Sequence, residues 1–346
     1  MMSNLGVKST QSSTKWANRP DKPMTINQAP DVEFYLDAAT RKNTRRSYEA
    51  AVRHFEVDWG GFLPATSESI AKYLASYAGT LATSTLTQRL AALAQWHIEQ
   101  GFPDPTKAPL VRKVLRGIRA EHPAQEKQAR PLQIEQLDQV DRWLADAITT
   151  AREAGQRGDY LRHTRDRALV LLGFWRGFRG DELTSLQAEH VQVAAIEGMS
   201  CFFPRTKGDR QHKGVTFQAP ALARLCPVSA YLDWISLAHI ERGPAFRSID
   251  RWGHVGDDGL HPNSLIPLLR SIFSKAGVDD ADEYSGHSLR RGFANWAAAD
   301  GWDTKSMMEY VGWKSIQSAM RYIDSSDRFA RYRPAPPRQI ENAEQD

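Results

Sequence analysis

Apolar residues recur along most of the chain with the three- and four-residue spacing of an α-helix. Before residue 122, four such stretches follow one another, over residues 44–58, 67–77, 84–100 and 110–121. The expected core residues are Tyr48, Val52, Phe55, Ile70, Leu74, Tyr77, Leu86, Leu90, Leu93, Ile98, Leu110, Val114 and Ile118. Since each stretch carries one apolar stripe, the pattern predicts a compact helical domain over residues 31–121. Ser67 is the expected N-cap of the second helix, and Gly101 is expected to end the third.

A polar stretch with prolines over residues 122–131 is typical of an interdomain linker. Helical spacing resumes beyond it, over residues 133–154, 162–177, 227–240, 263–276, 287–299, 304–311 and 315–324. Within residues 190–218 the period changes to two, and Glu197-Gly198 has the composition of a turn. The pattern therefore predicts a mixed α/β domain over residues 132–325 with one small antiparallel sheet.

The two ends of the chain lack a clear period. Residues 1–30 are polar and contain three prolines, so they are predicted to be a flexible leader. Residues 326–346 form a tail in which Phe329 and Tyr332 are the aromatic residues. The prolines that follow Tyr332 limit the length of any helix there, so the tail is predicted to lie outside the second domain.

Composition narrows the class of protein. None of the apolar runs in the 346 residues approaches the ~20 residues that cross a bilayer, and the N-terminus lacks the apolar core of a signal peptide. Two cysteines, Cys201 and Cys226, are too few for a disulfide framework or an all-cysteine zinc site. We therefore expect a reduced, cytoplasmic protein with no membrane partner.

Positive charge is concentrated in the first part of the chain. Residues 1–130 hold 18 Lys and Arg against 12 Asp and Glu, whereas the remaining residues hold 27 against 29. Clustered Lys and Arg neutralise phosphates, so this distribution favours a polyanionic partner.

Four short motifs in the second domain carry reactive side chains. They are Arg179-Gly-Asp-Glu182, Arg205-Thr-Lys207, His287-Ser-Leu-Arg290, and Trp313 followed nine residues later by Tyr322. Each motif alone also has an ordinary structural interpretation: a surface ion pair, a solvated hairpin lysine, a helix cap and a half-buried surface tyrosine.

Tyr322 fits the ordinary interpretation less well than the others. On an ideal helix, Ile316, Ala319, Met320 and Ile323 form one apolar stripe, and Tyr322 lies roughly 110° from its centre. This tyrosine is therefore not needed to fill the main core.

Taken together and in this order, the motifs resemble the tyrosine recombinase (phage integrase) family. The stretch from Ser285 to Ile323 resembles the terminal active-site block of that family, and the resemblance extends over about residues 31–330. Trp313 brings the chain nearest to the Cre-like members, which have tryptophan where most members have histidine. The resemblance implies a mainly α fold: an N-terminal helical core-binding (SAM-like) domain plus a mixed α/β catalytic domain with a small antiparallel sheet. The two domains would form a C-shaped DNA clamp.

The resemblance also implies a nucleophile and an anion site. The Tyr322 hydroxyl would attack a DNA phosphodiester and form a 3′-phosphotyrosine intermediate. Arg179 and Arg290 would offer forked donors to the non-bridging oxygens, on which negative charge builds. Glu182 would orient the neighbouring groups.

Proton transfer and further hydrogen bonds are implied for four side chains. His287 and the indole N–H of Trp313 would bind the same phosphate, and His287 is also a candidate acceptor of the tyrosine proton. Lys207 is the expected general acid for the leaving 5′-hydroxyl, and Lys213 in the same loop is its rival. No metal and no cofactor are expected, because the arginines stabilise the charge and the histidines show no zinc-ligand spacing.

Two helices of the first domain and one of the second are expected to contact DNA. The candidate residues are Arg45, Arg46, Gln88, Arg89, Asn263, Ser264 and Arg270. Gln and Arg read base edges in the major groove, although a phosphate contact or a solvated helix face fits each arginine equally well. Pro267 is unusual in the helix from Asn263, because proline can kink a helix.

The expected partners are double-stranded DNA with inverted-repeat recombination sites and three further copies of this chain. The family works as a homotetramer through a Holliday junction, and the resemblance implies that the tail docks on a neighbouring protomer. The alternative is that Phe329 and Tyr332 fold back onto their own domain. The location would be cytoplasmic and nucleoid-associated. Two alternatives stay open: a type IB topoisomerase-like or telomere-resolving enzyme, and a catalytically silent DNA-binding regulator.

Overall fold

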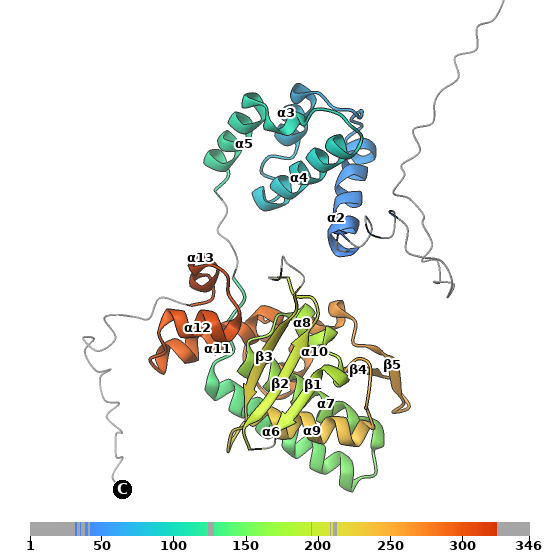
Figure 1. Cartoon of the computed structure of the whole chain (residues 1–346), viewed down its shortest axis with the longest axis vertical. Helices are drawn as coiled ribbons and strands as arrows, with labels where there is room; N and C mark the ends of the chain where they lie inside the picture. Colours follow the sequence, from blue (N-terminus) through green and yellow to red (C-terminus); the bar gives the residue numbers. More distant parts are fainter. Residues whose placement is uncertain are drawn as a thin grey trace, which may run out of the picture. The chain divides into compact units, whose positions relative to one another are not determined.

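The computed structural model describes residues 42–123, 128–194, 196–207, 209 and 213–323, together with residues 32, 35, 39 and 40. The chain divides into two units, residues 1–127 and 128–346 (Figure 1). Each unit has its own hydrophobic core, and the two cores share no residue. The leader over residues 1–30 and the tail over residues 326–346 lie outside the described residues. None of the helices in the described part is long and apolar enough to cross a membrane.

Unit 1 is built from helices. They are α2 (Lys42–Arg53), a π-helical turn (His54–Asp58), α3 (Ser67–Ser76), α4 (Thr83–Glu99), a 3₁₀ turn (Pro105–Lys107) and α5 (Pro109–Glu121). Phe55, Ile70, Tyr73, Leu74, Leu86, Leu90, Leu93, Val111 and Ile118 form the core. α2 packs against α4, and α3 packs against α5.

Three predictions for unit 1 are wrong, namely those for Ser67, Ile98 and Leu110. The N-cap of α3 is Thr66, whose hydroxyl accepts from the Ser69 N–H, rather than Ser67. Ile98 is 54% exposed, because the core position at the end of α4 is taken by His97. The His97 ring donates to the Leu93 carbonyl and accepts from the Ala65 N–H.

Leu110 is also exposed, because α5 begins at Pro109 and turns Val111 toward the core instead.

Unit 2 surrounds one buried helix. Its helices are α6 (Ile134–Glu153), α7 (Arg157–Arg176), α8 (Gly180–Ser185), α9 (Pro227–Ala238), α10 (Pro262–Lys275), α11 (Gly286–Ala299), α12 (Thr304–Val311) and α13 (Ile316–Met320), with 3₁₀ turns at Ala188–His190 and Ala281–Glu283. α7 packs against α6, α9 and α11 and against strand β3. Its last turns are buried on all sides, which fits the unbroken apolar run from Ala168 to Trp175.

The sheet of unit 2 is antiparallel, in the order β1 (Val191–Ala194), β2 (Gly198–Phe203), β3 (Val215–Pro220). Gly198 pairs with Ala194 and with Pro220, so the β1–β2 turn lies where Glu197-Gly198 was predicted. The fold class, mainly helical with a small antiparallel sheet, is therefore confirmed. A second hairpin, β4 (Arg247–Ile249) with β5 (Val255–Gly259), was not predicted, because its strands are short and mostly polar.

The last helix is shorter than predicted. α13 ends at Met320, so Tyr322 lies beyond it. Ile316 is 52% and Met320 57% exposed, and only Ala319 is fully buried. The predicted apolar stripe is therefore wrong, because a five-residue helix turns only one residue toward the core.

Helix α11 approaches the start of α6 so closely that only glycine fits at position 292. A Cβ there would overlap the carbonyl oxygen of Leu132, a backbone atom that cannot rotate away. We expect Gly292→Ala to lower the free energy of unfolding by about 1–3 kcal/mol, the usual cost of overpacking a core. Gly117→Ala in α5 is the matched control, because nothing lies near its Cβ position, and it should be neutral or stabilising. Urea denaturation of both variants measures the difference, and equal effects would contradict the prediction.

Candidate active site

The site begins where α7 ends and α8 starts. Gly177 ends α7 in the left-handed conformation with φ 57°, which glycine adopts without strain. Arg179 then stands at the N-cap of α8, and its N–H donates to Glu182 Oε2 (2.9 Å). Arg179 Nη1 also donates to Glu182 Oε1 (2.6 Å), and the Glu182 side chain is buried. Glu182 thus fixes both the start of α8 and the guanidinium of Arg179.

Helix α11 supplies a second, deeper guanidinium. A reciprocal capping box between Ser285 and Ser288 starts this helix. One turn further on, the side chain of Arg290 is 1% exposed and donates to the carbonyl of Gly177 (Nη1, 2.7 Å) and to that of Val311 (Nη2, 3.4 Å). Arg290 Nη1 also lies 3.7 Å from Glu182 Oε2. The end of α7 and the end of α12 therefore orient this arginine.

The balance of charges in the site favours the binding of an anion. Burial, and then the charge of Arg179, lowers the pKa of Arg290 to about 10, so the guanidinium stays charged at neutral pH. One carboxylate, Glu182, stands between the two guanidiniums. A phosphate oxygen would supply the missing negative charge.

Two aromatic residues close the site over Arg290. Gly312 ends α12 with φ 76°, and Trp313 follows it with 4% exposure. The Tyr322 ring stacks on Trp313 (5.4 Å between centroids) and on His287 (6.0 Å), and Arg290 Cζ lies 5.3 Å from the Tyr322 centroid. Trp313 Nε1 and Arg290 Nε are buried without a hydrogen-bond partner among the described residues. Because buried N–H groups rarely stay unpaired, these two donors point to a ligand.

The lysine candidates lie on the loop between β2 and β3. Lys207 and Lys213 are both exposed, and Gly208 and residues 210–212 between them lie outside the described part. The charge of Lys207 contributes to lowering the pKa of His287, which places this lysine within electrostatic range of the site. Over the described residues, no group of three or more His, Cys, Asp and Glu is placed to hold a metal ion.

His287 should remain neutral at physiological pH. Partial burial of its ring, then Arg290, Arg179 and Lys207, lowers its pKa, while Asp181 opposes the shift. The pKa therefore lies below the usual value near 6.5, and the proton-accepting form persists down to that pH. The family resemblance implies that His287 accepts the tyrosine proton. We therefore expect the single-turnover rate of the implied DNA cleavage to fall only below pH 6.5, and His287→Asn to lack this acidic limb. Rates from pH 5 to 8 measure it, and a midpoint above 6.5 would contradict the prediction.

The predicted DNA-reading residues of unit 1 do not share one surface. Gln88 Nε2 donates to Ser47 Oγ (2.8 Å), which joins α4 to α2. Arg89 instead turns inward, where Nη1 lies 2.9 Å from His54 Nδ1 and donates to the Tyr73 hydroxyl (3.1 Å). Arg45 is half-buried.

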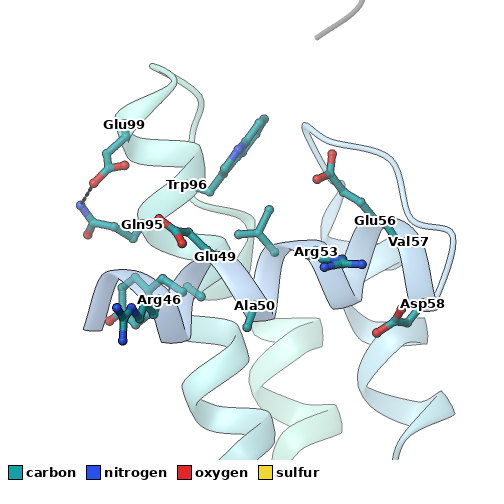
Figure 2. Close-up of a pocket in the computed structure, with 13 residues that line it drawn as sticks. Arg46, Glu49, Ala50, Arg53, Glu56, Val57, Asp58, Gln95, Trp96 and Glu99 are labelled. Carbon is teal, nitrogen blue, oxygen red and sulfur yellow. Dashed lines mark hydrogen bonds between the residues drawn. The ribbon is translucent and has the colours of Figure 1, made fainter. Parts of the chain in front are cut away.

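Arg46 lines a recess of about 840 Å³ between α2 and α4 (Figure 2). The recess carries Arg46 and Arg53 but also four carboxylates, namely Glu49, Glu56, Asp58 and Glu99, and Glu99 accepts from Gln95 (2.7 Å). Its walls include Val52 and the ring of Trp96. The excess of carboxylates disfavours this recess as a phosphate site.

In unit 2, Asn263 and Ser264 are exposed in the first turn of α10, whereas Arg270 Nε donates to the Tyr284 carbonyl (2.9 Å). Pro267 lies inside α10 beyond the first turn, and the helix runs on to Lys275 without interruption.

Sequence reasoning missed several groups of the site. The carbonyls of Gly177 and Val311 orient Arg290, and the pattern of side chains along a sequence does not predict which backbone carbonyl will accept a hydrogen bond. Arg176 was also missed, because it looks like an ordinary basic residue in the last turn of a helix.

Comparison with known proteins assigns the family. Residues 138–328, more than half of the chain, match the phage integrase family. An integrase/recombinase XerD homolog of Selenomonas ruminantium is 31% identical over 304 residues, which cover 85% of each chain. The protein therefore belongs to the phage integrase family. A relative in Rhizobium meliloti (strain 1021), 27% identical over 317 residues that cover 86% of this chain and 92% of the relative, is named tyrosine recombinase XerD.

The expected nearness to Cre-like members holds only as a distant match. The recombinase Cre of Escherichia phage P1 is 25% identical over 281 residues, covering 77% of this chain and 78% of Cre. Among solved structures, a λ integrase (75–356) dimer bound to a COC′ core site has a TM-score of 0.53 at 14% identity, covering 86% of this chain and 93% of the other. That likeness shows a common fold.

Proposed function

We propose that this protein is a site-specific DNA recombinase that cleaves and rejoins DNA through a 3′-phosphotyrosine intermediate and a Holliday junction. The observation that carries the proposal is the set of donors around Arg290. Two guanidiniums share one carboxylate, and Arg290 Nε and Trp313 Nε1 have no hydrogen-bond partner among the described residues, while both side chains lie against the ring of Tyr322. A tetrahedral phosphate beside a tyrosine nucleophile fits this arrangement.

In the proposed cleavage step, the Tyr322 oxygen attacks the phosphorus and the 5′-oxygen leaves on the opposite side. The phosphorus–tyrosine bond forms as the phosphorus–5′-oxygen bond breaks. Arg179 and Arg290 stabilise the charge on the non-bridging oxygens, and Lys207 gives a proton to the leaving oxygen. His287, which is neutral, accepts the tyrosine proton. Rejoining reverses these steps with a 5′-hydroxyl from another strand, so no external energy source is required.

The proposed DNA partner is a duplex with inverted-repeat sites. A structure of similar fold, the XerH site-specific recombinase, is described as bound to a difH substrate, with a TM-score of 0.52 at 14% identity over 88% of this chain and 84% of XerH. We assign residues 31–121 to core binding and 132–325 to catalysis, with both domains clamping one duplex. Four copies on two sites would complete the assembly in the cytoplasm, at the nucleoid.

The two alternatives predict different experimental outcomes. A topoisomerase-like enzyme would relax supercoils without exchanging strands, and a silent regulator would form no covalent complex. The unpaired donors of Arg290 and Trp313 favour a catalytically active site. Buried polar groups without partners lower the stability of the fold, and an inactive protein would have no function to offset that cost.

Covalent capture on duplexes of random sequence tests the proposal and finds the DNA site in the same experiment. Purified protein is incubated with such duplexes, each carrying a nick, and covalent complexes are recovered under denaturing conditions and sequenced. We expect an inverted repeat to be enriched, also in the presence of EDTA, and two such sites on one plasmid to recombine. Relaxation without exchange would select the topoisomerase-like alternative, and the absence of any adduct would select the regulator.

The tail is proposed to link neighbouring protomers. Phe329 and Tyr332 are its aromatic anchors, and the prolines after them shorten the docking segment to about residues 326–333. We expect deletion of residues 326–346 to spare single-site DNA binding and to abolish synapsis of two sites. Native gels of two-site complexes measure this, and undiminished synapsis by the truncated protein would overturn the idea.

A further inference from the structure

A third arginine is buried behind the proposed phosphate site. Arg176 is the last residue of α7 and is 2% exposed. Its guanidinium lies between the rings of Tyr310 and Phe217, with Cζ at 4.2 Å and 4.5 Å from their centroids. Phe217 in turn lies against Gly312, the residue before Trp313. Arg176 is thus packed directly behind the end of α12.

The charge of Arg176 is not neutralised by any partner in the described part of the chain. Nη2 donates to the Tyr310 carbonyl, while Nε and Nη1 are buried without a well-aligned hydrogen-bond partner among the described residues. The Tyr310 side chain and, from a distance, the charge of Glu182 stabilise the charged guanidinium, but no described carboxylate forms an ion pair with it. Aromatic faces compensate a buried cation only in part. An arginine keeps its proton even when buried, so unit 2 keeps a desolvated positive charge here.

Such an arrangement costs folding stability. A buried charge without an ionic partner is expensive, and an apolar residue of similar volume is often neutral or stabilising in its place. The packing around Arg176 is apolar and aromatic, so methionine or leucine would fit the surroundings better than a guanidinium. The reason for an arginine therefore has to be sought outside folding.

We propose, building on the proposed function, that Arg176 is a positioning residue of the cleavage step that acts through Arg290. It holds the α12 segment that carries the Val311 carbonyl acceptor of Arg290, and its charge pushes the guanidinium of Arg290 toward the phosphate. Arg176, Arg179 and Arg290 then give the site three positive charges against the one negative charge of Glu182, and of these four side chains only Arg179 is partly exposed. The positive potential beneath the scissile phosphate is higher than the two direct arginines alone would give.

Arg176→Met removes the charge and keeps the volume. Loss of a direct oxyanion donor costs ~10²–10³ in rate, and we expect roughly tenfold slower adduct formation for this more distant charge. The variant should be at least as thermally stable as the wild type. On a duplex with a methylphosphonate at the scissile position, which lacks the negative charge, wild type and variant should differ by no more than about twofold.

Two further variants separate charge from packing. Arg176→Lys keeps the charge, so its rate on the normal phosphate should stay within about threefold of wild type. Tyr284→Phe, elsewhere in unit 2, removes the hydrogen bond from the Tyr284 hydroxyl to Gln136 Oε1 (3.1 Å) without any change of charge. Any defect of this control should be equal on both substrates.

The experiment uses full-length protein and a nicked duplex recovered by covalent capture. An equal slowing of Arg176→Met on both substrates, or no slowing, would overturn the inference. If Arg176→Met fails to fold, a folded Arg176→Lys that loses tenfold on both substrates would overturn it, and one that cleaves at nearly the wild-type rate would support it. A wild-type protein that forms no Tyr322-linked adduct would refute the proposed function itself, which separates the two failures.

Discussion

Tyr322→Phe is expected to abolish covalent attachment to DNA while DNA binding stays nearly intact. The substitution removes only the oxygen proposed as the nucleophile, and the phenyl ring can still stack on Trp313 and His287. Removal of a nucleophile leaves no alternative route to the adduct, so the loss should be complete on a denaturing gel. A nicked suicide duplex gives the measurement, because the cleaved end diffuses away and traps the complex.

The matched control is Tyr284→Phe, which removes a hydroxyl from another tyrosine of the same unit. The Tyr284 hydroxyl donates to Gln136 Oε1 (3.1 Å) rather than facing Arg290, so this variant should still form the adduct. A covalent adduct that persists in Tyr322→Phe would remove Tyr322 from the proposed mechanism.

Lys207→Ala is expected to slow cleavage strongly, by about 10²–10⁴, the usual contribution of a general acid. A 5′-phosphorothiolate at the scissile position should restore the rate, because the leaving sulfur needs no proton. The same rescue should be absent from Arg290→Gln, which loses charge stabilisation rather than proton donation. Single-turnover rates on both substrates give the comparison.

Lys213→Ala is the control on the same loop. Lys207 precedes residues 208–212 and Lys213 follows them. Both side chains are exposed, so both are candidates for the proton donor. Rescue of Lys213→Ala but not of Lys207→Ala would show that the general acid had been assigned to the wrong lysine.

The sequence predicted which helices form, because helical periodicity is a local property. The predictions fail where tertiary packing determines the outcome. Packing buries His97 rather than the neighbouring Ile98 at the end of α4, and it ends α13 before Tyr322. The β4–β5 hairpin was missed, because a pair of short polar strands has no hydrophobic alternation to detect.

The order of the motifs led to the family, and the structure brings Arg179, Glu182, His287, Arg290, Trp313 and Tyr322 together. Their roles stay predictions. The backbone acceptors and the buried charge of Arg176 could not be predicted, because they depend on where α7 and α12 end in space rather than on residue type. The DNA-reading residues were the least predictable, since Arg89 turned out to bind within its own unit.

The separation of the two cores bears on how such proteins diversify. No core residue is shared between the units, and every residue of the proposed active site lies between Arg176 and Tyr322. A gene fusion at the boundary between residues 127 and 128 would therefore exchange the first unit for one from another member and leave the contacts of Gln128 and Arg130 with the rest of the second unit in place. If the proposed division of roles holds, new target preferences would be inherited as whole modules, while the proposed chemistry of strand transfer passed unchanged from one lineage to the next.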